Sequence, residues 1–236
     1  IVSSQATPPD FSDDPYVLTC LAKAALSGGA VAVRANGPDV IREMREAFAA
    51  PILGINKIGR ETNEVYITPT LAAAREVIEA GADFIAVDAT NRPRPDGGSA
   101  AELIAQIKAN YDIPIVADIS TTEEAVEAER CGADFVATTL AGYTRYTKTT
   151  KLRGASLVQD IATKVDIPIL AEGNIWRPEE AVAAINAGAW AVVIGSAITR
   201  PRLIAARFAK ALADSTQEMN LCTDEERTDG DDANGL

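Results

Sequence analysis

Two charged side chains end short apolar runs of this sequence and could exchange protons with a substrate. Lys57 closes the run PILGINK, and Glu172 closes IPILAE. Because burial destabilises an ammonium ion, a lysine at the end of a buried strand gives up its proton more readily, and it can act as a base or as a Schiff-base amine. A nearby carboxylate can assist as an acid or base. We predict Lys57 and Glu172 as catalytic residues; from spacing alone, a solvent-exposed lysine and a structural ion pair are equally consistent.

Glycine follows two of the apolar runs. Gly173-Asn174 comes directly after Glu172, and Gly195-Ser196 comes after the run AWAVVI. A backbone without a Cβ lets N–H groups approach an anion closely. We therefore predict these four residues as a phosphate-binding site, with tight strand-to-helix turns as the alternative. Arg200 follows shortly and could bind the same phosphate with two hydrogen bonds.

Polar residues also end the remaining apolar runs. These are Gln5, Arg34, Asp88, Asp118 and the pair Thr138-Thr139. Asp88 and Asp118 could accept hydrogen bonds from substrate hydroxyl groups or orient the lysine amine. Arg34 could bind an anionic or carbonyl oxygen, with a salt bridge at the rim as the alternative.

The chain contains no histidine, which leaves proton transfer to lysine, carboxylate or tyrosine groups. It also removes most imidazole metal sites, and no carboxylate spacing indicates a Mg²⁺ site, so no metal is predicted. Three cysteines, Cys20, Cys131 and Cys222, form no C-x-x-C pattern. We interpret them as thiols of a protein in a reducing cytoplasm.

Two recurring patterns predict the elements that carry these residues. A Gly-Ala pair leads into an apolar run four times, and a proline leads into an apolar run three times. With residues 1–5 they give eight candidate strands, and between them lie segments long enough for one helix each. The strand regions are 1–5, 28–37, 51–57, 81–90, 113–120, 132–142, 167–173 and 188–196. The clearest helical segments are 71–80, 100–110, 122–131 and 155–165.

Alternation of apolar strands and helices is typical of α/β proteins with a parallel sheet buried on both faces. Eight units favour closure into a (β/α)8 TIM barrel over residues 1–213. The alternative is an open doubly wound sheet, which usually carries a G-x-G-x-x-G turn that this sequence lacks. In a closed barrel the carboxyl ends of all strands meet at one mouth, so the polar residues named above are expected to converge there.

Charge and hydropathy exclude several classes of partner. The net charge is −12, which argues against a nucleic-acid partner. Residues 214–236 contain eight acidic residues and one basic residue, and we interpret this segment as an acidic, mostly disordered tail. No apolar run reaches the ~18 residues of a membrane span, and no secretory signal is present, so we expect a soluble protein that does not bind membranes. The oligomeric state is left open, with a homodimer as one option.

Several stretches together resemble one family, the N-acylglucosamine-6-phosphate (N-acetylmannosamine-6-phosphate) 2-epimerases of sialic-acid catabolism. The resemblance extends to about residue 212, and its most specific parts are DATNRPRP, AEG with its downstream proline, and GSAITRP. The matching stretches are IVSSQA at 1–6, AVAVRANG at 30–37, PILGINK at 51–57, YITPT at 66–70, GADFIAVDATNRPRP at 81–95, TTLAGYT at 138–144, AEGNIWRPEEA at 171–181 and GAWAVVIGSAITRP at 188–201.

This resemblance implies a TIM barrel that interconverts N-acetylmannosamine 6-phosphate and N-acetylglucosamine 6-phosphate without a cofactor. By matching motif, it implies Lys57 as the catalytic lysine and Glu172 as the second acid/base residue. It further implies substrate contacts by Gln5, Arg34, Asp118 and Arg200, and phosphate contacts by Gly173, Gly195 and Ser196. Two alternatives remain open. One is a Schiff-base lyase or aldolase acting through the same lysine on another sugar phosphate, and the other is a sugar-phosphate-binding protein without activity.

Overall fold

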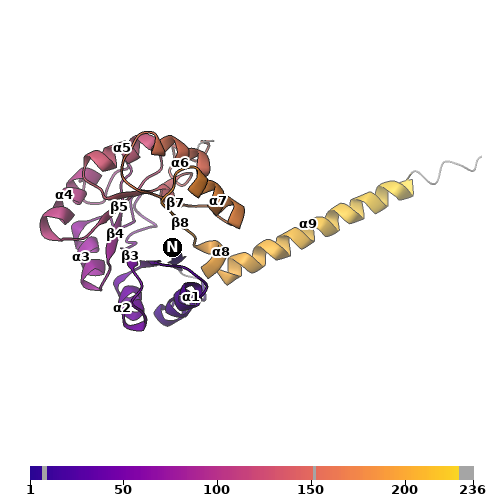
Figure 1. Cartoon of the computed structure of the whole chain (residues 1–236). Coiled ribbons are helices and arrows are strands. Elements are labelled where there is room, and N and C mark those ends of the chain that lie inside the picture. The colour runs from indigo at the N-terminus through magenta and orange to yellow at the C-terminus, as the bar shows by residue number, and fades with distance from the viewer. Residues whose placement is uncertain (7–9, 151–152, 229–236) are drawn as a thin grey trace, which may run out of the picture.

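The computed structural model describes residues 1–6, 10–150 and 153–228, and its centre is an eight-stranded parallel sheet (Figure 1). Neighbouring strands follow one another in sequence order, from β1 to β8. Each expected strand region contributes one strand, so these predictions are confirmed. The strands are β1 (Val2–Ser4), β2 (Val33–Asn36), β3 (Ile52–Ile55), β4 (Phe84–Asp88), β5 (Ile115–Asp118), β6 (Phe135–Ala137), β7 (Ile169–Glu172) and β8 (Ala191–Val193).

The first strand meets the residue that follows the last one. Val2 forms a parallel bridge with Ile194. The Ser3 amide donates to the Ile194 carbonyl at 2.8 Å, and the Ile194 amide donates to the Ile1 carbonyl at 3.0 Å. These bonds close the sheet, which confirms the predicted TIM barrel and excludes the open-sheet alternative.

Helices surround the strands and alternate with them along the chain (Figure 1). Their local signals agree with the sequence. The Thr121 hydroxyl accepts from the Glu124 amide and the Glu124 carboxylate accepts from the Thr121 amide, which makes a capping box at the start of α5. The helical elements are α1 (Pro15–Ser27), α2 (Pro38–Ala47), α3 (Leu71–Glu79), α4 (Ala100–Asn110), α5 (Thr122–Arg130), the 3₁₀ turn η1 (Thr138–Leu140), α6 (Ala155–Ala162), α7 (Pro178–Asn186), α8 (Ser196–Thr199) and α9 (Pro201–Thr228).

Alternate residues of the strands belong to two apolar layers. One layer, which includes Ile52, Ile85 and Ile115, packs against the helices. The other, which includes Leu53 and Val116, fills the barrel interior. Because apolar side chains occupy much of the inside, charged and polar side chains gather toward the carboxyl ends of the strands.

The C-terminal segment differs from the prediction. The sequence predicts disorder from residue 214 onward, whereas the structure continues α9 through residue 213 as far as Thr228. After Pro201 this segment has no proline and no glycine before Gly230, so no backbone constraint interrupts a helix once it has begun. α9 points away from the barrel (Figure 1). Residues 229–236 of the predicted tail lie outside the described residues, and a domain boundary at 213 stays a prediction.

In the part of the chain that the structure describes, no helix is both long enough and apolar enough to cross a membrane.

Candidate active site

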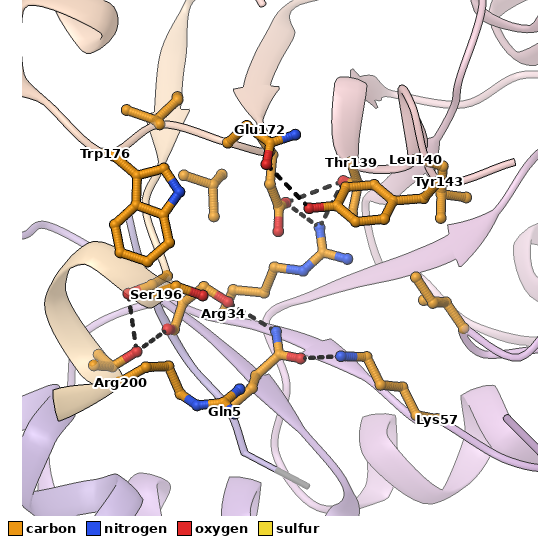
Figure 2. A pocket seen from close by; sticks show the side chains of 18 of the residues that line it. Gln5, Arg34, Lys57, Thr139, Leu140, Tyr143, Glu172, Trp176, Ser196 and Arg200 are labelled. Carbon is orange, nitrogen blue, oxygen red and sulfur yellow. Dashed lines mark hydrogen bonds and ion pairs between the residues drawn. The ribbon is translucent and has the colours of Figure 1, made fainter. Parts of the chain in front are cut away.

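A cavity of about 310 Å³ opens at the carboxyl ends of the strands (Figure 2). Nine of the residues predicted from the sequence line it, although they lie in or after five different strands. They are Gln5, Arg34, Lys57, Glu172, Gly173, Asn174, Gly195, Ser196 and Arg200. The mouth of the barrel therefore brings the predicted catalytic and phosphate-binding residues together.

Arg34 lies at the centre of a buried ionic network. Its side chain is 1% exposed, and its Nη1 and Nη2 atoms donate to the two carboxylate oxygens of Asp118 at 3.0 and 2.6 Å. Nη1 also lies 2.6 Å from Glu172 Oε2 (Figure 2). One cation thus holds two carboxylates that would otherwise repel each other. The expected contact of Arg34 with substrate stays a prediction, and its observed partners are these two acids and the Thr139 hydroxyl, which lies 3.4 Å from Nη1.

Glu172 is fixed at both its main chain and its side chain. The Thr138 hydroxyl accepts from the Glu172 amide at 3.0 Å and donates to its carbonyl at 2.9 Å. The Thr139 hydroxyl lies 3.1 Å from Glu172 Oε2 and 2.7 Å from Asp118 Oδ1. Together with Arg34, these contacts give the Glu172 carboxylate one defined position at the edge of the cavity.

Burial raises the pKa of Glu172, since removal from water penalises the carboxylate. The charge of Arg34 lowers this pKa, and the charge of Asp118 raises it. The net direction is upward, so Glu172 holds a proton at higher pH than an exposed glutamate does. A carboxyl group of this kind can donate as well as accept a proton.

Lys57 extends into the same cavity from the end of β3. Its Nζ donates to Gln5 Oε1 at 2.7 Å, and Gln5 Nε2 donates to Ser3 Oγ at 2.9 Å (Figure 2). Burial, followed by the positive charge of Arg34, lowers the pKa of Lys57 to about 8. A substantial fraction of the lysine is therefore neutral near pH 8, and a neutral amine can act as a base.

The turn after β7 contains two residues with positive φ. Gly173 and Asn174 adopt φ values of 105° and 57°, and because Gly173 has no Cβ, a ligand can approach its main chain closely. Gly195, after β8, lies against β1, where an added Cβ would come within 3.3 Å of Ser3 Cβ. Ser196 follows at the start of α8. We refer to Gly173, Asn174, Gly195 and Ser196 as the glycine cradle.

Arg200 stands beside the glycine cradle but is engaged with an acid. Its Nε and Nη2 donate to Asp10 Oδ2 at 3.0 and 2.7 Å. Hydrogen bonds from Ser12, together with Arg200, lower the pKa of Asp10, so this partner is ionised at neutral pH. An anion in the cradle would share Arg200 with Asp10.

Two predicted substrate contacts lie behind the cavity. Asp118 binds Arg34 and Thr139, and Asp88 accepts from Thr90 and from Arg92, whose Nη2 is 2.6 Å away. Neither aspartate is among the described residues that line the cavity. Their contact with substrate stays a prediction. Within the described residues, no group of three or more cysteine or acidic side chains could hold a metal ion.

The comparison with protein families agrees with this geometry. A model of the family described as N-acetylmannosamine-6-phosphate epimerase matches residues 18–214. The chain belongs to this family.

Relatives and a solved structure extend the match over most of the barrel. The chain is 46% identical over 209 residues to an N-acetylmannosamine-6-phosphate 2-epimerase of Caldanaerobacter subterraneus subsp. tengcongensis, with 88% of each chain covered. It is 41% identical over 212 residues to a protein of the same name from Clostridioides difficile, which covers 90% of this chain and 95% of the relative. The solved N-acetylmannosamine-6-phosphate 2-epimerase from Clostridium perfringens matches with a TM-score of 0.84 and 40% identity, over 89% of this chain and 91% of that one.

In this member of the epimerase family, three aromatic side chains of the cavity were not singled out from the sequence. Tyr66, Tyr143 and Trp176 line the cavity, and the Tyr143 hydroxyl lies 3.4 Å from Asn174 Oδ1. Each lies on a loop, and the sequence of a loop has no hydrophobic periodicity that would indicate the direction in which its side chains point. A signal was nevertheless present, since all three stand in the matching stretches YITPT, TTLAGYT and AEGNIWRPEEA.

Proposed function

We propose that this protein interconverts N-acetylmannosamine 6-phosphate and N-acetylglucosamine 6-phosphate by removing and returning the proton at C2. The observation that carries this proposal is the placement of Lys57 and Glu172 in one cavity with the glycine cradle. A base, an acid and an anion site are the groups that this reaction needs. The sugar ring would lie between the first two, with its 6-phosphate at the cradle.

The chemistry follows from the ring-opened sugar. Its C2 hydrogen is α to the C1 aldehyde, so neutral Lys57 can take the proton while the C–H electron pair moves into the C1–C2 bond. The aldehyde oxygen then gains the negative charge, and protonated Glu172 stabilises it by donating a proton. C2 is planar in the resulting enol. Once the enol has turned its other face toward Lys57, the ammonium returns a proton to C2 there while the enol hydroxyl gives its proton back to Glu172, which yields the epimer. Glu172 also assists opening of the ring.

The positions of the two residues suit a reaction on a planar centre. Lys57 follows β3 and Glu172 ends β7, and strands four apart stand on opposite sides of an eight-stranded barrel. The substrate would therefore have a proton-transferring group on each side.

Incubation of each epimer in D₂O, followed by NMR, tests the proposal. Both 6-phosphates should acquire deuterium at C2 and reach the same mixture. Lys57→Ala should lose this exchange, and exchange at the wild-type rate would remove Lys57 from the mechanism. A Schiff-base lyase would instead be trapped as a covalent adduct by borohydride in the presence of substrate. Tight binding of either 6-phosphate without exchange would indicate a binding protein.

We further infer that the protein acts in the cytoplasm as a homodimer and does not bind nucleic acid. The net charge of −12 supports the last point, because phosphate backbones repel an acidic surface. Cys20 and Cys131 are free thiols, which suits a reducing compartment. α9 supports the dimer, since it leaves the barrel and carries Phe208 with 70% of its surface exposed. A monomer mass in light scattering would contradict it.

A further inference from the structure

Trp176 forms part of the cavity wall beside the glycine cradle. Figure 2 shows its indole near Ser196, on the side of the cavity away from Lys57. The main chain of its loop is fixed, because Glu180 Oε2 accepts from the Trp176 amide at 2.7 Å and from the Arg177 amide at 3.1 Å. These bonds place the backbone but leave the indole free to rotate about its side-chain bonds.

A residue of α9 contacts the indole. The guanidinium carbon of Arg207 lies 4.2 Å from the centre of the Trp176 ring. Arginine above tryptophan is a favourable cation–π arrangement. Within the described residues, Arg207 makes no ion pair or hydrogen bond and does not line the cavity. The guanidinium therefore covers the indole from outside, and the stacking contact is its interaction with the barrel.

We propose that Arg207 is a positioning residue that holds Trp176 as the wall of the substrate site next to the glycine cradle. This inference rests on the proposed function in taking the ligand as a sugar phosphate. By this contact α9 becomes part of the site, although most of its length lies outside the barrel (Figure 1). A change in the direction of α9 would move the indole and alter the fit of the phosphorylated end of the sugar.

The chain holds only two tryptophans, so fluorescence can follow one of them. In a Trp190→Phe background the emission comes from Trp176 alone. We compare Arg207→Ala, Arg207→Lys and, as a control, Lys210→Ala. Lys210 is another exposed cation of α9, and it pairs with Asp214 rather than with an aromatic ring. The control removes the same charge from the same helix without touching the indole.

Arg207→Ala should make Trp176 more accessible to acrylamide quenching and raise KM for N-acetylmannosamine 6-phosphate about two- to fivefold, the size expected for an exposed cation–π contact. Its kcat should change less than twofold, because Arg207 touches none of the reacting groups. Arg207→Lys should restore part of both effects, and Lys210→Ala should resemble the parent. If the alanine variant folds poorly, Arg207→Lys still allows quenching and KM to be compared with those of the parent.

Two results would overturn the proposal. If Arg207→Ala has the same acrylamide quenching and the same KM as the parent, the contact does not hold the indole. A change in quenching with an unchanged KM would show that the indole is held but that its position does not matter to substrate. If the parent shows no C2 exchange, the proposed function fails separately. Titration of Trp176 emission with inorganic phosphate, in the parent and in Arg207→Ala, still tests the link to the cradle.

Discussion

Arg34 and Glu172 form a 2.6 Å ion pair across the inside of the barrel, although 138 residues separate them in the chain. The same guanidinium binds both oxygens of Asp118. The proposed catalytic acid is thus held by a cation that is itself anchored to a second acid. This arrangement fixes the Glu172 carboxyl group, and the trio of Arg34, Asp118 and Glu172 carries one excess negative charge when both acids are ionised.

Replacement of Arg34 by methionine should be strongly destabilising. It leaves Asp118 and Glu172 facing each other without a cation, and breaking a buried ion pair costs ~3–5 kcal/mol. Urea unfolding at pH 7 measures the loss, which should shrink at lower pH as a carboxyl group takes up a proton. Arg42→Met is the control, because Arg42 and Asp39 are an exposed pair and should contribute ~0–1 kcal/mol. Equal losses in the two variants would contradict the role of Arg34.

The pH dependence of the reaction should report Lys57. Its pKa is lowered to about 8, so the neutral amine becomes more abundant as the pH rises toward and past that value. We expect kcat/KM to rise with pH and to level off above about 8. Lys57→Arg should abolish this rise of kcat/KM with pH, because arginine stays protonated throughout this range. If kcat/KM of Lys57→Arg still rises with pH, the titrating group is a residue other than Lys57.

Lys57 should also make stability depend on pH. The unfolded chain, with its ordinary lysine pKa, binds more protons than the folded chain between about pH 8 and the lysine model value of 10.5. The free energy of unfolding should therefore gain a favourable contribution as the pH rises through this window. Urea unfolding of wild type and Lys57→Met at pH 7.5 and 9.5 checks the sign. A gain of the same size in Lys57→Met would exclude Lys57 as its source.

Gly173→Ala should weaken substrate binding beyond its cost in stability. Gly173 has a φ of 105°, where alanine is strained, and its main chain belongs to the glycine cradle. Gly29 offers a matched control, with a φ of 106° in the turn after α1, and no atom lies within 4 Å of an added Cβ. Both alanine variants should lose ~1 kcal/mol or more of stability. Only Gly173→Ala should raise KM for N-acetylmannosamine 6-phosphate. An equal KM in the two variants would contradict a role of Gly173 in phosphate binding.

Arg200→Ala should raise KM for the 6-phosphate about tenfold or more, since a charge-assisted hydrogen bond contributes ~1.5–3 kcal/mol. Turnover of the unphosphorylated sugar should barely change. Asp10→Asn should lower KM modestly, because it weakens the competition for the Arg200 guanidinium. Kinetics with both sugars provide the measurement. A similar loss with the unphosphorylated sugar would place Arg200 away from the phosphate.

The sequence predicted the barrel and the location of its mouth because both follow from local patterns. Apolar runs, Gly-Ala turns and capping residues repeat along the chain, and each run ends in a polar or glycine residue. The partners of those residues were harder to predict. That Asp118 would bind Arg34 rather than line the cavity depends on strand register and on rotamers, which no local pattern records.

The helical course of α9 and the inward turn of Trp176 were missed for different reasons. An acidic composition indicated a tail without a core, yet helix formation needs only uninterrupted backbone hydrogen bonding. The side chain of a loop residue, in turn, takes its direction from neighbours that are remote in sequence. Arg207 is such a neighbour, and it stands 31 residues after Trp176.

The closure of β1 onto Ile194 has a consequence for folding. Arg34, Lys57 and Glu172 meet only when β2 and β3 have been joined in one barrel with β7, so the site is made of contacts of high sequence separation. Such contacts form slowly, because the intervening chain must first lose its freedom. Recovery of epimerase activity during refolding should therefore lag behind the return of helical circular dichroism, and catalysis itself would report the moment at which the barrel closes.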